Sequence, residues 1–148
     1  RLWHKNTPGG HTKIRFLPNT PRQLQSQLSL YVNKTALGKY GEDLAGAYLT
    51  KLGYKIIERN FRIRGGEIDI IATDVNTLVY VEVKTRSTHQ FGLPEESVNY
   101  YKLKFMERAS KFYRLQRKNL PELERIDVVS VDLSGSEAKI KLIKNASL

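Results

Sequence analysis

The sequence predicts an α/β fold in which helices flank a mixed β-sheet. Apolar residues recur at helical spacing in two segments, around residues 35–53 and 98–112, and alternate with polar ones in shorter runs. Turn-forming residues separate these runs, which gives the order α-β-β-β-α-β-β. With 148 residues, of which 40% are hydrophobic, the chain can build one domain with a core.

The first helix is expected to begin at Thr35, which can cap it, and to end at Gly53, a residue typical of helix C-termini. Its apolar residues are Leu37, Leu44, Tyr48 and Leu52. Residues 1–34 are polar, rich in Pro, Gly, Thr and Asn, and without sustained periodicity. We predict that they form a basic flexible arm or a non-native extension, and that residues 35–148 form the folded domain.

Five strands are expected, at residues 54–63, 67–73, 78–86, 124–133 and 138–145. The turns "RGG" and "DVNT" separate the first three, and "SGSE" joins the last two into a hairpin. A loop at 87–96 leads to the second helix. The predicted apolar stripe of that helix consists of Val98, Tyr101, Phe105, Ala109 and Phe112.

The composition excludes several kinds of site. The chain has no cysteine, which rules out disulfides, thiolate zinc sites and cysteine nucleophiles, and agrees with the reducing cytoplasm where we expect the protein. With only three histidines, a metal site must be mostly oxygen-liganded, which favours Mg²⁺, with Mn²⁺ as a substitute. No apolar run approaches 18 residues, so no membrane span is expected.

The net charge of +10 indicates a polyanionic partner, usually nucleic acid. The charge is unevenly distributed, because residues 1–34 hold six basic residues and no acid. The remainder holds 19 basic and 15 acidic residues, so the predicted domain is only mildly basic.

The strand at 78–86 has charged residues on the face opposite its valines. If it forms an antiparallel hairpin with 67–73, with Val75 and Asn76 at the tip, opposing residue numbers sum to 151. The apolar face then consists of Ile68, Ile70, Ala72, Val79, Val81 and Val83. A slip of one residue would pair apolar with charged side chains and is excluded.

On the other face of this hairpin, Asp69 lies opposite Glu82, and Glu67 opposite Lys84. A slip of two residues would instead pair Asp69 with Tyr80 or Lys84. Directly opposed carboxylates lie about 5 Å apart and repel by roughly 3 kcal/mol at an effective dielectric of about 20. A divalent cation would turn this repulsion into attraction, so we predict a metal site at Asp69 and Glu82.

The first helix contributes a third acid. Glu42 stands at the end of an apolar row that continues through Ala45, Leu49 and Leu52. A carboxylate facing the sheet is costly unless it is paired or binds a metal. The alternative is that Glu42 lies at the rim, in water.

Glutamate on a first helix, then aspartate, then Glu-x-Lys across a hairpin resembles the Asp…(Asp/Glu)-x-Lys motif of the restriction-endonuclease-like nuclease superfamily. The chain is also similar to the bacterial YraN-type family, an uncharacterised endonuclease-like group. Four stretches carry this resemblance: "GKYGEDLAGAYLTKLGYKIIERNFRIRGGEIDIIATD", "LVYVEVKTR", "FGLPEESV" and "RIDVVSVD". It covers roughly Ala36 to Leu133, and as an ordered run of motifs it is very specific.

The resemblance implies a restriction-endonuclease-like core with a phosphodiesterase site, in which Glu42, Asp69, Glu82 and Lys84 match the catalytic motif. Asp69 and Glu82 would hold Mg²⁺ with help from the Val83 carbonyl, and Glu42 would bind the ion through water or complete a second site. Lys84 would orient or polarise the attacking water and offset charge on the phosphate.

Four basic residues are candidates for contact with nucleic acid: Arg62, Arg64, Arg86 and Lys102. The three arginines could equally be solvated. Glu67 is either a metal ligand or the ion-pair partner that positions Lys84. His89 is either a general acid or an ordinary loop residue, and the second alternative is favoured.

On the second helix Lys104, Arg108, Lys111 and Lys118 form a basic stripe, which is either a solvated face or a track for the nucleic-acid backbone. Tyr48 and Tyr101 lie in apolar patterns and are expected to pack in the core.

The function predicted from these features is a metal-dependent endonuclease acting on nucleic acid, with DNA favoured, and on branched or flapped structures as resolvase-like relatives suggest. Such a role would favour a symmetric homodimer. One alternative is a non-catalytic nucleic-acid-binding module on the same fold, which the intact set of four motif residues disfavours. Another is an assembly protein whose charged face is a docking surface.

Overall fold

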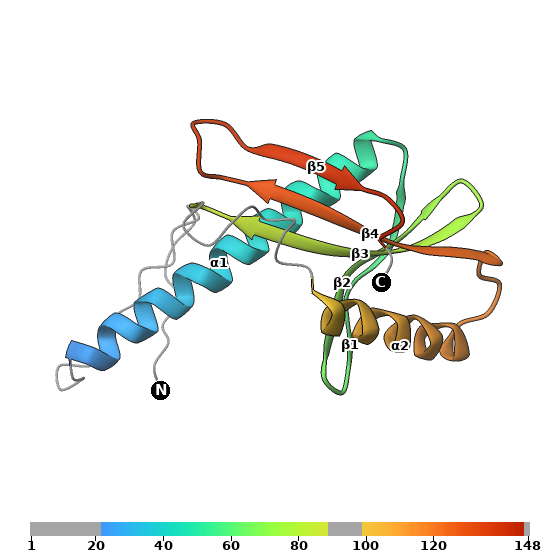
Figure 1. The fold of residues 1–148 in the computed structure, drawn as a ribbon, viewed down its shortest axis with the longest axis horizontal. Helices are drawn as coiled ribbons and strands as arrows, with labels where there is room; N and C mark the ends of the chain where they lie inside the picture. The colour runs from blue at the N-terminus through green and yellow to red at the C-terminus, as the bar shows by residue number, and fades with distance from the viewer. Residues whose placement is uncertain (1–21, 89–98, 147–148) are drawn as a thin grey trace, which may run out of the picture. The chain divides into compact units, whose positions relative to one another are not determined.

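A computed structural model describes residues 22–88 and 99–146 of the chain. In these residues the predicted order α-β-β-β-α-β-β is confirmed (Figure 1). The elements are α1 (Arg22–Lys51), β1 (Lys55–Ile63), β2 (Gly66–Asp74), β3 (Thr77–Arg86), α2 (Tyr100–Gln116), β4 (Leu123–Asp132) and β5 (Lys139–Ile143). No described helix is both long and apolar enough to cross a membrane.

The five strands form one mixed sheet in the order β1-β2-β3-β4-β5. β1, β2 and β3 are antiparallel neighbours, and β4 and β5 form the predicted terminal hairpin. β3 and β4 run parallel, so the chain must cross over between them, and α2 lies in this crossover.

The start predicted for the first helix is wrong, because α1 begins at Arg22 and Thr35 lies inside it. The stretch from Arg22 to Leu37 contains neither proline nor glycine, so nothing interrupts a helix there. The chain divides into two units between Leu37 and Gly38, within α1. The predicted arm or extension at residues 1–34 stays a prediction, and residues 1–21 of it lie outside the described part.

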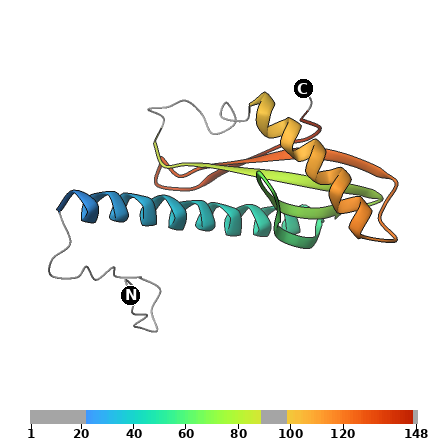
Figure 2. The same cartoon turned by 90° about the horizontal axis from the view of Figure 1, so that it is seen from below.

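The unit that starts at Gly38 has a core on each face of its sheet (Figure 2). On one face Ala45 and Leu49 of α1 pack against Ile70 and Val81, and on the other Met106 of α2 packs against the face that includes Tyr80. Because both faces are covered, β2 and β3 are nearly continuously buried instead of alternating between core and solvent.

Ile68 does not lie on the predicted face. It packs with Phe61 and Ile71 in the cluster on the α2 side, whereas Ile70 packs on the α1 side. Residues two apart lie on the same face of a regular strand. Ile68 and Ile70 lie on opposite faces, so β2 is irregular between them. On β1, Asn60 lies between the partners of Ile68 and Ile70, and its φ of 54° marks a local break in the regular strand.

The apolar stripe predicted for the second helix is also wrong in part. The buried residues of α2 are Leu103, Met106, Ala109, Ser110 and Tyr113. Tyr101, which was expected in the core, is 81% exposed, and Phe112 is 44% exposed. Two rows of residues recur at helical spacing on this helix, so periodicity alone could not choose between them. Leu52 of α1 was misplaced in the same way and is 48% exposed.

Candidate active site

The site lies where β2 and β3 separate. Their ladder runs from Asp74–Thr77 to Ile70–Val81, which confirms the predicted register with numbers that sum to 151. The next predicted pair, Asp69 with Glu82, is not a ladder pair, and beyond it the β1–β2 hairpin turns away from β3 (Figure 1). The side chain of Asp69 takes the place of the missing carbonyl, because its Oδ2 accepts a hydrogen bond of 2.7 Å from the Val83 N–H.

Asp69 is 7% exposed and lies in an unfavourable position for a negative charge. Burial is the main cause that raises its pKa, to about 7, and the negative charge of Glu82 is the second. Val83 N–H and Lys102 act in the opposite direction, and Glu42 raises the pKa slightly further. The three predicted acids therefore form one electrostatic group, although they come from three different elements.

Glu82 is 2% exposed and lies between two lysines. Lys84 Nζ is 2.7 Å from its Oε1, and Lys102 Nζ is 2.7 Å from its Oε2. Among the described residues Oε2 accepts no hydrogen bond, so its contact with Lys102 is an ion pair only. The same ammonium donates a hydrogen bond of 3.0 Å to the Glu67 carbonyl, and thus connects α2 to the separated end of β2.

Glu42 is placed by two residues whose role the sequence did not reveal. A Cβ on the preceding Gly41 would come within 1.8 Å of Thr85 Oγ1, so only glycine lets α1 approach β3 this closely. Asn60 Nδ2 then donates a hydrogen bond of 2.9 Å to Glu42 Oε2. An available signal was the asparagine itself, which is depleted in strands and tolerates a positive φ.

The ion pair predicted between Glu67 and Lys84 is not present. Glu67 Oε2 instead accepts a hydrogen bond of 2.7 Å from Arg62, its ladder partner on β1, and Lys84 pairs with Glu82. The reason is that the β2–β3 ladder ends at the Ile70–Val81 pair, so Glu67 has no cross-strand neighbour on β3.

Two of the remaining predicted residues, Arg64 and Arg86, are described and lie at strand ends. Arg64 is exposed at the β1–β2 turn, where its carbonyl accepts a hydrogen bond from Arg108. Arg86 lies at the end of β3, and its buried Nε has no hydrogen-bond partner among the described residues. His89 and most of the loop at 87–96 fall outside the described residues. Contact of the predicted basic residues with nucleic acid stays a prediction, as do the two alternatives for His89.

The oxygen ligands at this site suit a hard cation such as Mg²⁺. Among the described residues, no group of three or more His, Cys, Asp or Glu is already arranged to hold a metal ion. The buried carboxylates of Asp69 and Glu82 nevertheless repel each other, and Glu82 Oε2 accepts no hydrogen bond from the described residues. A divalent cation would relieve both conditions. Lys84 and Lys102 supply positive charge beside Glu82.

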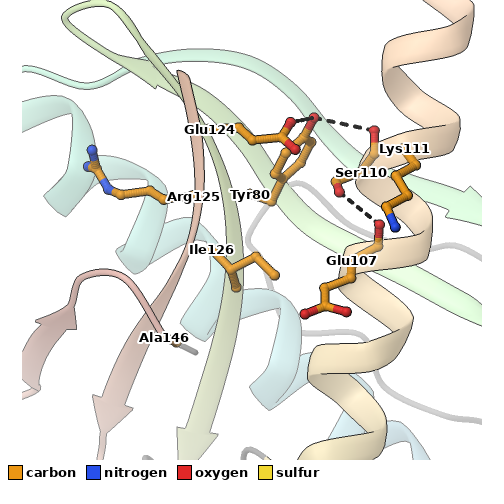
Figure 3. Close-up of a pocket in the computed structure, with 8 residues that line it drawn as sticks. All are labelled: Tyr80, Glu107, Ser110, Lys111, Glu124, Arg125, Ile126 and Ala146. Atoms are coloured by element: carbon orange, nitrogen blue, oxygen red, sulfur yellow. Dashed lines mark hydrogen bonds between the residues drawn. The ribbon is translucent and has the colours of Figure 1, made fainter. Parts of the chain in front are cut away.

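A separate pocket of about 430 Å³ lies between α2 and β4 (Figure 3). It contains none of the predicted site residues. The Tyr80 hydroxyl at its wall is 3.4 Å from the Ser110 carbonyl and 3.3 Å from Glu124 Oε2, and Arg114 also binds Glu124. These contacts join α2 to β3 and β4, so we assign them a structural role.

Comparison with known proteins places the chain in a family. Residues 41–131 match the model of the uncharacterised protein family UPF0102. The chain belongs to this family. It is the YraN-type group that the sequence resembles, so that prediction is confirmed. The matched segment includes all four motif residues: Glu42, Asp69, Glu82 and Lys84.

Three UPF0102 proteins illustrate the similarity. One from Geobacter metallireducens is 43% identical over 115 residues, which is 78% of this chain and 94% of the relative. One from Syntrophus aciditrophicus is 48% identical over 110 residues, or 74% and 86% of the two chains. One from Caldicellulosiruptor saccharolyticus is 42% identical over 117 residues, or 78% and 99%. Their names state no activity.

Proposed function

We propose that the protein is a metal-dependent endonuclease that hydrolyses phosphodiester bonds in nucleic acid, with DNA as the preferred substrate. The observation that carries this proposal is the convergence of the Asp69 and Glu82 carboxylates with Lys84 at the point where β2 and β3 separate. Two carboxylates beside a lysine supply the charges that metal-assisted phosphoryl transfer requires.

Asp69 and Glu82, together with the Val83 carbonyl, would hold Mg²⁺ or Mn²⁺, and Glu42 would contribute from α1. When bound, the ion would supply Lewis-acid stabilisation of the negative charge that develops on the phosphate. Lys84, whose side chain is 28% exposed, would orient the attacking water and offset phosphate charge. Lys102 would place positive charge beside Glu82 and hold α2 against β2.

We further propose that the enzyme acts in the cytoplasm and as a homodimer. Cutting two strands of a branched substrate needs two copies of the site, so we include a symmetric homodimer. The lack of cysteine agrees with action in the cytoplasm.

Lys84→Ala tests the proposal directly. We expect the wild-type protein to cut at least one of single-stranded, duplex, flapped or four-way-junction DNA, or RNA, in Mg²⁺ or Mn²⁺ but not in EDTA. The variant should lose this activity by about 100-fold or more, because it lacks a group that stabilises transition-state charge. Lys55→Ala, at the exposed start of β1, is the matched control and should retain it. Equal cutting by wild type and Lys84→Ala would indicate a contaminating nuclease.

A second candidate function is favoured by one observation, namely that Glu82 is already paired with two lysines. Such a neutralised carboxylate is compatible with a non-catalytic module that binds nucleic acid on the same fold. Salt-sensitive binding by both wild type and Lys84→Ala, without cutting in any metal, would favour this module over the nuclease.

A further inference from the structure

The solvent-exposed face of α2 carries aromatic and basic side chains in one continuous row. We call it the α2 stripe, and its members share one side of the helix: Tyr101, Lys104, Arg108, Lys111, Phe112 and Leu115. All are exposed, because the opposite side of the helix supplies the core contacts through Leu103, Met106 and Tyr113. Within the described part of the chain none of the six belongs to either core cluster, and Arg108 donates a hydrogen bond to the Arg64 carbonyl.

The composition of the α2 stripe differs from that of an ordinary solvated helix face. Tyr101 is 81% exposed, and Phe112 (44%) and Leu115 (85%) lie one helical turn apart as an exposed apolar pair, a kind of surface that marks interaction sites. Three cations, Lys104, Arg108 and Lys111, lie between Tyr101 at one end of the stripe and Phe112 and Leu115 at the other. Glu107, at the edge of the stripe, has its Oε2 3.6 Å from Lys104 Nζ. Aromatic rings beside cationic groups are typical of surfaces that stack bases and contact phosphates.

The α2 stripe begins at the end of α2 that lies next to the proposed active site. Lys102, the neighbour of Tyr101, contacts Glu82 at 2.7 Å. Arg108 donates a hydrogen bond of 3.3 Å to the carbonyl of Arg64 at the β1–β2 turn. From Tyr101 to Leu115 the helix extends for about 21 Å, at a rise of about 1.5 Å per residue. A strand lying on the stripe would thus lead directly to the opening between β2 and β3.

We propose that the α2 stripe binds a single-stranded segment of nucleic acid. Bases stack on Tyr101 and Phe112, and Lys104, Arg108 and Lys111 contact the phosphates between them. This inference rests on the proposed nuclease function and specifies its substrate class, namely nucleic acid with a single-stranded portion, as in a flap or a branch. Duplex bases are already stacked on each other and cannot offer their faces to these rings.

A second copy of the chain is the competing occupant of an exposed apolar face. A two-fold contact through the α2 stripe would bring its three cations close to those of the partner, in a chain with a net charge of +10. Nucleic acid would neutralise the same charges. Charge complementarity therefore favours the polyanion.

The test measures binding in EDTA, so that it does not depend on cleavage. Fluorescence anisotropy would compare a labelled single-stranded oligonucleotide with the same sequence as a blunt duplex. The variant Tyr101→Leu/Phe112→Leu keeps an apolar surface but removes the rings, and Tyr101→Phe keeps the ring. We expect wild type and Tyr101→Phe to prefer the single strand, and the double-leucine variant to bind it at least about tenfold more weakly.

Two outcomes would overturn the inference: equal affinity of wild type for both forms, or unchanged single-strand affinity of the double-leucine variant. Sedimentation of the same proteins would overturn it in favour of self-association if wild type is a dimer and the double-leucine variant is a monomer. If cutting depends on the metal and on Lys84 but binding shows no preference for the single strand, the nuclease proposal stands. Only the proposal for the α2 stripe is then rejected. Ring-dependent binding without any cutting would reject the nuclease alone.

Discussion

Asp69 shows how one residue links folding to the proposed chemistry. Burial and the charge of Glu82 raise its pKa to about 7, whereas an aspartate in an unfolded chain has a pKa near 3.9. Between these two values the folded protein keeps a proton that the unfolded chain has lost. The contribution of Asp69 to stability is therefore complete at low pH and decreases as the pH rises towards 7.

Replacing Asp69 with asparagine removes this titration. We expect Asp69→Asn to be more stable than wild type at pH 8, by at most about 4 kcal/mol, and this advantage to shrink as the pH falls towards 4. Urea unfolding at several pH values measures the difference. A stability difference that is independent of pH would contradict the assigned cause.

The same substitution provides a test for the metal. If Asp69 and Glu82 hold Mg²⁺, the ion should raise the free energy of unfolding of wild type at pH 8, because it binds only the folded state. It should not do so for Asp69→Asn. An equal effect of Mg²⁺ on both proteins would place the ion elsewhere.

At the scale of elements, the contact of α1 with β3 decides where Glu42 lies. A methyl group at Gly41 would collide with Thr85, whose Oγ1 would be 1.8 Å away. We expect Gly41→Ala to destabilise the protein by about 1–3 kcal/mol through overpacking and to displace Glu42 from the site. Thermal unfolding and the cleavage assay would report these two effects.

Gly46 provides the matched control on the same helix, because a Cβ there would have no neighbour within 4 Å. Gly46→Ala should stabilise the protein by up to about 1 kcal/mol, since alanine is the better helix former. If both substitutions changed the stability in the same direction, the close approach of α1 to β3 would not be what requires glycine at position 41.

At the scale of the whole molecule, net charge should govern affinity for nucleic acid but not chemistry. Deletion of residues 1–21 removes four basic residues and no acid: Arg1, Lys5, Lys13 and Arg15. We expect weaker binding to all nucleic acids alike and a shallower dependence of log affinity on log salt. Cleavage at saturating substrate should remain dependent on Lys84. A selective loss of one substrate class would mean that these residues recognise structure.

Much of the site was determined by the sequence alone. The alternation of apolar and charged residues in β2 and β3 excludes a slip of one residue, which would pair apolar with charged side chains. The element order followed from such patterns, whereas a slip of two residues was also compatible with them. Asp69 and Glu82 lie close enough to interact, although they are not a ladder pair. The order of motifs likewise sufficed to indicate the family.

Only the tertiary structure decided which contacts the charged residues make. The pairing of Glu67 with Arg62, the insertion of Lys102 beside Glu82 and the positioning of Glu42 by Asn60 depend on where β2 leaves β3. Periodicity also could not choose between the two rows of α2, because both satisfy helical spacing and the sheet buries just one of them. A local sequence pattern specifies the faces of an element, whereas the partner of each face is a property of the assembled fold.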